Sequence, residues 1–103
     1  MVIKQYNIEL SDEAEADLDD SYNYYNEISF SVADTFIKQI GLSFDFIKQN
    51  PEVSPVILRS LRKFVVVRFP FVIYYRLIEE TIQVVAIFHT SRNPKIWNER
   101  LNK

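Results

Sequence analysis

The sequence predicts an α+β fold in which an N-terminal strand and an antiparallel helix hairpin precede a three-strand antiparallel meander, with both helices packed on one face of the sheet. Three observations predict this fold. Apolar residues alternate near the N-terminus, recur every three or four residues through two segments before Pro51, and crowd into nearly continuous runs after residue 59. At 103 residues the chain is expected to form a single domain, residues 1–103, around one core.

The N-terminal strand is predicted from the alternation of apolar and polar side chains. Tyr6, Ile8 and Leu10 alternate with polar residues, which is the period-2 pattern of a half-buried strand. Ser11 follows as a candidate N-cap, because its hydroxyl can accept a hydrogen bond from a free N–H in the first turn of a helix. The chain is therefore expected to pass directly from strand into helix.

Two amphipathic helices are predicted after Ser11. The first has one apolar stripe to about residue 28, and the second opens near Ser29 or Ser31. The second helix must end at Asn50, because the ring and the missing N–H of Pro51 oppose further helix. The link between the helices is so short that they should form an antiparallel hairpin. The apolar stripes consist of Ala14, Leu18, Tyr22, Tyr25 and Ile28, and of Ala33, Phe36, Ile37, Ile40, Phe44 and Ile47.

The C-terminal half is predicted to form three strands, at residues 59–68, 71–78 and 81–89. Pro70 marks the first turn, and the pair Glu79 and Glu80 marks the second. The second and third strands are almost continuously apolar. Such runs are typical of strands that are covered on both faces or lie centrally in a sheet.

Composition excludes several kinds of site. The chain has no cysteine and a single histidine, so a zinc site would need three nearby carboxylates, for which no spacing argues. Gly41 stands alone within a predicted helix, so there is no glycine-rich phosphate loop. No apolar run approaches the roughly 20 residues of a membrane helix. We expect a cytoplasmic protein with no metal, no cofactor and no membrane partner.

Charge is divided unevenly along the chain. Residues 1–55 carry a net charge of −8, whereas residues 56–103 carry +6. This asymmetry is compatible with an acidic partner for the basic half, either nucleic acid or an acidic protein segment. It is equally compatible with solvated helix faces in the first half and a sheet edged by lysine and arginine in the second.

Polar side chains gather where the last predicted strand ends. His89 is able to act as a general acid or base near neutral pH, and Arg92 is able to hold a phosphate. Alternatively, His89 hydrogen-bonds a neighbouring backbone group. Trp97, with Pro94, either closes an edge of the core or stacks on a base.

Two motifs and the order of elements resemble one known superfamily. The motifs are the hairpin Arg-Phe-Pro-Phe-Val-Ile-Tyr-Tyr-Arg at residues 68–76 and the tail His-Thr-Ser-Arg-Asn-Pro-Lys-Ile-Trp at residues 89–97. Over essentially its whole length the chain resembles the RelE/ParE superfamily, the toxins of type II toxin–antitoxin modules. The resemblance implies a small toxin that forms a hetero-oligomer with an antitoxin protein wrapped around it. Toxins of the RelE type cleave mRNA in the ribosomal A site, whereas those of the ParE type poison DNA gyrase.

The residues favour the ParE branch. In RelE-type nucleases the resemblance places a catalytic arginine on the strand that returns after the turn, where this chain has Val72. A valine can neither pair with phosphate nor stabilise charge, and an isoelectric point of about 5.3 suits ribosomal RNA poorly. We therefore expect a non-catalytic toxin that binds DNA gyrase. The alternatives are a metal-independent mRNA endonuclease that acts on the ribosome, and an inactive relative kept as a binding module. The endonuclease would use Arg62, Lys63, His89 and Arg92.

The antitoxin is expected to contain a mostly disordered segment that folds on this surface. A helix of this segment would lie against the tyrosine-bearing helix hairpin, and a strand would extend the sheet edge. The segment should be acidic where it meets Arg62, Lys63, Arg68 and Arg92. The residues predicted to bind target or antitoxin are Arg59, Arg62, Lys63, Arg68, Arg76, Arg92 and Trp97.

Overall fold

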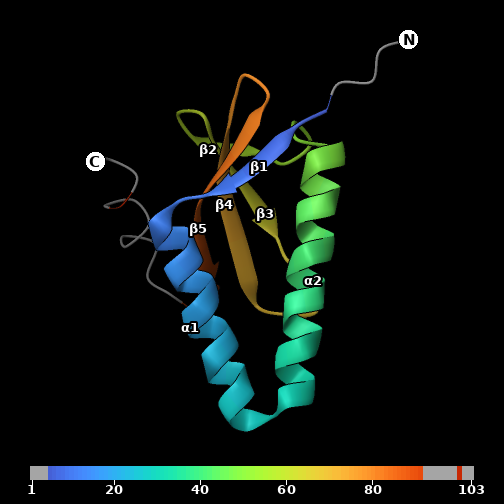
Figure 1. Cartoon of the computed structure of the whole chain (residues 1–103). Coiled ribbons are helices and arrows are strands. Elements are labelled where there is room, and N and C mark those ends of the chain that lie inside the picture. The colour runs from blue at the N-terminus through green and yellow to red at the C-terminus, as the bar shows by residue number, and fades with distance from the viewer. Residues whose placement is uncertain (1–4, 92–99, 101–103) are drawn as a thin grey trace.

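The computed structural model of the chain describes residues 5–91 and Arg100. Two helices lie on one face of a five-stranded sheet (Figure 1). This arrangement confirms the predicted α+β fold with a helix hairpin on one sheet face. The elements in chain order are β1 (Asn7–Leu10), α1 (Asp12–Ile28), α2 (Phe30–Gln49), β2 (Val56–Leu58), β3 (Leu61–Val65), β4 (Phe71–Ile78) and β5 (Thr81–His89).

The sheet has the strand order β1-β5-β4-β3-β2. Strand β1 pairs in parallel with β5, from Asn7 opposite Thr81 to Leu10 opposite Val84. The other three pairs of neighbouring strands are antiparallel. The predicted meander therefore forms the middle of the sheet, and the N-terminal strand closes one side of it.

The strand predicted at residues 59–68 is shorter than expected. A turn at Arg59, which has a positive φ of 52°, separates β3 from the short edge strand β2. Strand β3 ends at Val65, and a second positive φ of 74° at Arg68 turns the chain toward β4. Left-handed backbone is rare for residues other than glycine, so nothing in the sequence indicated the turn at Arg59, whereas Pro70 had marked the one at Arg68.

The helix hairpin begins and ends at the predicted residues. The Ser11 side chain accepts a hydrogen bond from the Ala14 N–H at 3.1 Å, which confirms it as the N-cap of α1. Ser29 alone separates the two helices. Helix α2 ends at Gln49, and the Asn50 N–H bonds back to the carbonyl oxygens of the last turn before Pro51.

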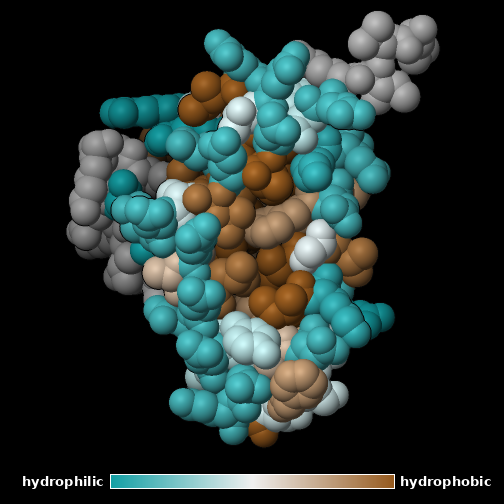
Figure 2. All heavy atoms as spheres, in the orientation of Figure 1, coloured by the Kyte–Doolittle hydropathy of each residue, from teal (hydrophilic) through white to brown (hydrophobic). Residues whose placement is uncertain are grey.

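Apolar side chains pack on both faces of β4 and β5. On the helix side, Phe71, Ile73 and Tyr75 join residues from α1 and α2 in the main core. On the other side, Val72 and Tyr74 belong to a second buried cluster. The two adjacent tyrosines point to opposite faces, and both are buried. Figure 2 shows apolar side chains in the hollow between the two helices, with polar side chains along the helices' outer sides.

A bulge changes the alternation of side chains in β5. Tyr74 lies opposite Ala86, and Tyr75 lies opposite Val84, so Val85 is an extra residue in the ladder. Val85 and Ala86 therefore both belong to the second cluster, and Ile87 returns to the main core.

The buried tyrosines predict a loss of stability at alkaline pH. Burial raises the pKa of Tyr74 and of Tyr75 above the usual value of 10.0. An unfolded tyrosine ionises near pH 10, whereas the folded one resists ionisation. Their contribution to the free energy of unfolding is therefore complete below pH 10 and is lost as the pH rises through the raised folded pKa.

We expect Tyr75→Phe to make the fall in stability between about pH 8 and about pH 11 shallower, because phenylalanine cannot ionise. The variant also loses the hydrogen bond from the Tyr75 hydroxyl to the Pro51 carbonyl oxygen at 2.8 Å, so its stability at neutral pH should fall by about 1 kcal/mol. The measurement is urea unfolding across this pH range. Tyr24→Phe, at an exposed site, is the control, and an equally shallow slope in both variants would contradict the assignment.

Candidate functional site

The predicted basic residues do not form one cluster. Arg62 lies on the helix side of the sheet, where its guanidinium donates to the carbonyl oxygens of Glu52 at 2.9 Å and Ser54 at 2.7 Å. These bonds hold the connection between α2 and β2, so this side chain is engaged within the chain. Lys63 and Arg76 lie on the opposite face, since they pair with Tyr74 and Leu61 of the second cluster.

The remaining predicted cations are more widely separated. Arg59 precedes β3, and Arg68 follows its far end, so the two exposed side chains flank opposite ends of the strand. Arg92 and Trp97 lie outside the described residues. Val72, which stands where the resemblance places the nuclease arginine, is only 5% exposed and belongs to the second cluster.

Beyond the short strand β2, the edge of β3 is open. The last hydrogen bond to β3 from this side joins the Lys63 N–H to the Pro55 carbonyl oxygen at 3.1 Å. Because successive residues of a strand direct their N–H and C=O groups to alternate sides, Val65 presents both groups to the same side as Lys63. The strand order places nothing beyond Val65 on this side among the described residues.

A groove of about 430 Å³ follows this open edge, and we call it the β3 edge groove. Its walls are largely apolar, and the rings of Phe46 and Phe64 lie 5.6 Å apart in one of them. Val65 is 60% exposed, although a valine in a strand usually packs against a neighbour. Such a surface is suited to an added strand with apolar side chains. The lining residues are Phe46, Val53, Ser54, Pro55, Lys63, Phe64 and Val65.

His89 is hydrogen-bonded to the residues that follow it. Its Nδ1 accepts the Ser91 N–H at 3.0 Å and lies 2.7 Å from the Ser91 hydroxyl. Because a backbone N–H can only donate, Nδ1 carries the lone pair, and the proton of the neutral ring is on Nε2. The ring also packs edge-to-face on Phe71, with centroids 5.3 Å apart. The lone pair that a general base would need is thus used within the chain.

Asp17 on α1 joins the helix to the edge of β5. Its carboxylate accepts the Ile87 N–H at 3.0 Å and pairs with the Arg100 guanidinium at 2.7 Å and 3.3 Å. The guanidinium also lies 4.6 Å from the centre of the Phe88 ring. The Asp17 side chain is 9% exposed, so this ion pair is well shielded from solvent.

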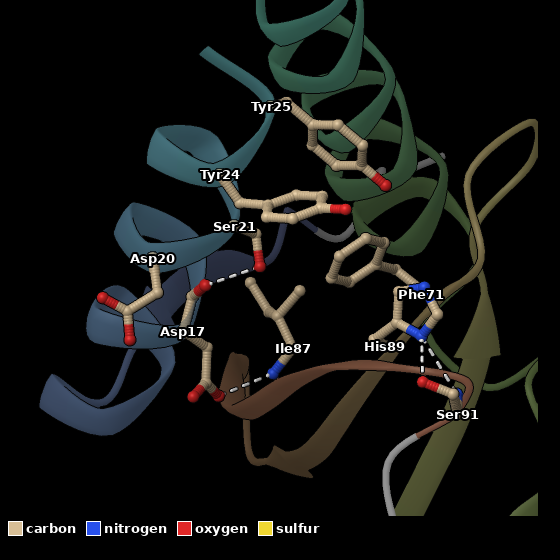
Figure 3. Close-up of a pocket in the computed structure, with 9 residues that line it drawn as sticks. All are labelled: Asp17, Asp20, Ser21, Tyr24, Tyr25, Phe71, Ile87, His89 and Ser91. Carbon is tan, nitrogen blue, oxygen red and sulfur yellow. Dashed lines mark hydrogen bonds between the residues drawn. The ribbon is translucent and has the colours of Figure 1, made fainter. Parts of the chain in front are cut away.

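A cavity of about 450 Å³ lies beside this contact, between α1 and the end of β5. We call it the α1–β5 cavity. Figure 3 shows Tyr24 and Tyr25 extending from the helix over it, with Phe71 and His89 on the facing strands. Burial and then the neighbouring Tyr24 raise the pKa of Tyr25. The lining residues are Asp17, Asp20, Ser21, Tyr24, Tyr25, Phe71, Ile87, His89 and Ser91.

Of the residues that line this cavity, only His89 was predicted from the sequence as a site residue. The tyrosines fitted the apolar stripe of a helix, and Asp17 looked like part of a solvated acidic face. The only available signal was the density of tyrosines at residues 22–25, which exceeds what one buried stripe needs.

Two kinds of function receive no support from the described part of the chain. Within residues 5–91 and Arg100, no three side chains of His, Cys, Asp or Glu type are grouped so that they could hold a metal ion. In the same residues, neither helix has the length and apolar character needed to cross a membrane.

The chain is similar to known proteins in sequence and in fold. A family model described as the ParE toxin of type II toxin–antitoxin system, parDE, matches residues 8–94. Among solved structures, a chain of the chromosomal ParDE TA system from P. aeruginosa matches with a TM-score of 0.73 and 21% sequence identity. The match covers 84% of this chain and 98% of that chain, and at this identity it shows a shared fold. No curated protein matches the chain.

Asp17→Ala should lower the free energy of unfolding by about 2–3 kcal/mol, because it leaves the Ile87 N–H and the Arg100 guanidinium without their acceptor. Asp19→Ala is a matched control on the same helix, since Asp19 is exposed, and its effect should stay within about 0.5 kcal/mol. Urea unfolding of both variants measures the difference. Equal effects would mean that the Asp17 contacts contribute little to stability.

Proposed function

We propose that this chain, which belongs to the ParE toxin family of type II toxin–antitoxin systems, acts by binding DNA gyrase and has no catalytic step of its own. The observation that carries the proposal is the hydrogen bonding of the His89 ring. Nδ1 of His89 is occupied by Ser91, and a buried Val72 stands in place of the nuclease arginine. Among the described residues, the lone pair of the candidate general base is engaged within the chain and no arginine stands at the position of Val72, which suits inhibition by binding.

The alternative, a RelE-like mRNA endonuclease, would need its cations and its proton-transfer group around one phosphate. Arg62 and Lys63 lie on opposite faces of the sheet. His89 pairs with Phe71, whereas Arg62 pairs with Tyr75, four residues further along β4. This offset alone is roughly 13 Å at the usual rise of a strand. The arrangement of these described residues therefore favours the binding mechanism.

Membership of a type II module implies an antitoxin partner. We propose that a strand of the antitoxin pairs with β3 in the β3 edge groove, where the N–H and C=O of Val65 have no partner in the part of the chain that the structure describes. A helix of the antitoxin would fill the apolar hollow between α1 and α2 seen in Figure 2. Acidic residues of the strand would meet Lys63 and Arg68. The two proteins would form a hetero-oligomer in the cytoplasm, where gyrase acts.

Purified toxin, separated from its antitoxin, should inhibit DNA supercoiling by gyrase and leave mRNA intact on translating ribosomes. Both assays should be run side by side with the same preparation. Cleaved mRNA with normal supercoiling would overturn the proposal. Activity in neither assay would favour an inactive binding module.

The companion variant changes His89 alone to alanine. Growth arrest should persist in this variant, because gyrase inhibition needs no proton transfer. Thermal unfolding shows whether the variant is folded. Loss of arrest by a folded variant would favour the nuclease alternative.

Val65→Pro should weaken antitoxin binding at least roughly tenfold, because proline removes the N–H that the added strand would use. The pairing of β3 with β4 does not use this N–H, since Val66 supplies the N–H that bonds the Phe71 carbonyl oxygen at 2.9 Å. Val65→Thr retains both the N–H and a branched side chain, so it is the matched control. The measurement is the dissociation constant of the complex.

The charge contribution is tested separately by reversing Lys63 and Arg68 to glutamate. Affinity should fall most at low salt, where electrostatic attraction is least screened. Reversal at Arg62 is less informative, because it would also break the bonds to Glu52 and Ser54. Salt-independent affinity in the wild type would exclude an electrostatic contribution.

A further inference from the structure

Within residues 5–91 and Arg100, no strand pairs with the outer edge of β5 over its second half. Strand β1 accompanies β5 only as far as Leu10 opposite Val84, where the Ser11 N–H bonds the Val84 carbonyl oxygen at 3.0 Å. The chain then turns into α1, and no strand continues this side of the sheet among the described residues.

Two backbone groups at this edge face the α1–β5 cavity. The Ile87 N–H points outward, since it bonds Asp17, and the alternation of a strand therefore turns the Ile87 C=O and the His89 N–H to the same side. No hydrogen bond within the described residues uses either of these two groups. A C=O and an N–H two residues apart form the pair that one residue of a parallel strand engages.

The cavity beside these groups has aromatic walls. Tyr25 lies 5.4 Å from Tyr24 and 6.2 Å from Phe71, measured between ring centroids, with edge-on geometry in both pairs. His89 adds a fourth ring, and Ile87 adds an aliphatic surface. The volume of about 450 Å³ exceeds what one buried side chain needs, and Tyr24 is 61% exposed at its rim. A large aromatic or aliphatic side chain would cover this apolar surface.

The acidic charge of α1 indicates which partner residues would flank that side chain. Helix α1 carries seven acidic and no basic side chains. Asp17 is neutralised by Arg100, but Asp20 at the cavity is exposed and forms no ion pair with any other described residue. A lysine or arginine placed here would meet the Asp20 carboxylate and the exposed face of Tyr24, both of which attract a cation.

We propose that the α1–β5 cavity binds an extended, basic segment of a partner protein, which places one large apolar side chain among the rings and a lysine or arginine beside Asp20. The segment pairs with the Ile87 C=O and the His89 N–H in the direction of β1. This site lies at the opposite side of the sheet from the β3 edge groove and has the opposite charge preference. It is therefore a second protein-binding site, distinct from the one proposed for the acidic antitoxin strand.

The probe is the peptide acetyl-Gly-Lys-Phe-Lys-Gly-amide, titrated into the isotope-labelled full chain and followed by NMR. The amide resonances of Ile87 and His89, and the ring resonances of Tyr24, should shift together. Peptides with Ala in place of Phe, or with Glu in place of both Lys residues, should bind with an affinity at least roughly tenfold lower. Equal binding of all three peptides, or shifts confined to other parts of the chain, would overturn the proposal.

Tyr24→Ala should weaken binding of the same peptide about tenfold without disturbing the fold, because this ring is largely exposed. Phe30→Ala is the matched control, since Phe30 is a 69% exposed aromatic residue at the tip of the hairpin, outside the cavity. Ser21→Phe, which fills the cavity, should abolish binding. Should that variant fail to fold, the comparison of Tyr24→Ala with Phe30→Ala still tests the proposal. An equal loss of peptide affinity in these two variants would refute the site. None of these measurements involves gyrase, so their outcome is separate from that of the proposed function.

Discussion

The pairing of β4 with β5 is the interaction on which the rest of the structure depends. Its register runs from Phe71 opposite His89 to Ile78 opposite Thr81, and most side chains of both strands are buried. Strand β1 attaches to one side of this pair and β3 to the other, while both helices pack on one face. Each fully buried aliphatic or aromatic side chain contributes about 1.5–3 kcal/mol, so this hairpin holds much of the stabilising free energy.

Both candidate surfaces arise where an outer strand of the sheet ends early. Strand β1 stops at Leu10 because Ser11 caps α1, so the far half of β5 receives a helical carboxylate, Asp17, in place of a strand. Strand β2 is also short, because the turn at Arg59 leaves it only three residues. Beyond β2, the edge of β3 has apolar walls but no covering segment among the described residues. Among the described residues, the sheet is thus well packed at its centre and has backbone groups without a strand partner at both edges.

Local sequence signals predicted the helices and strands. The two candidate sites depend on contacts between residues that are far apart in the sequence. Ser11, Ser29 and Pro51 marked the helix ends correctly, because caps and proline act through neighbouring residues. Nothing local indicated that the Arg62 guanidinium would bond carbonyl oxygens of residues 52 and 54, or that β1 would run parallel to β5. The α1–β5 cavity was missed for the same reason, since its walls come from residues 17–25 and 71–91. His89 was found because a lone histidine at a strand end is visible in sequence, but its partner Ser91 was not.

The charge division along the chain has a spatial counterpart in these surfaces. The acidic half supplies α1, which borders the α1–β5 cavity, and the basic half supplies Lys63 and Arg68 near the β3 edge groove. A partner segment of one charge is therefore attracted to one side of the sheet and repelled from the other. An antitoxin strand held only at the β3 edge would leave the cavity open. Neutralisation by such a strand alone would require energetic coupling between the β3 edge and the surface that meets the target. Steric coverage by a second antitoxin element on the helix hairpin is the simpler mechanism, and it requires an antitoxin that wraps the toxin.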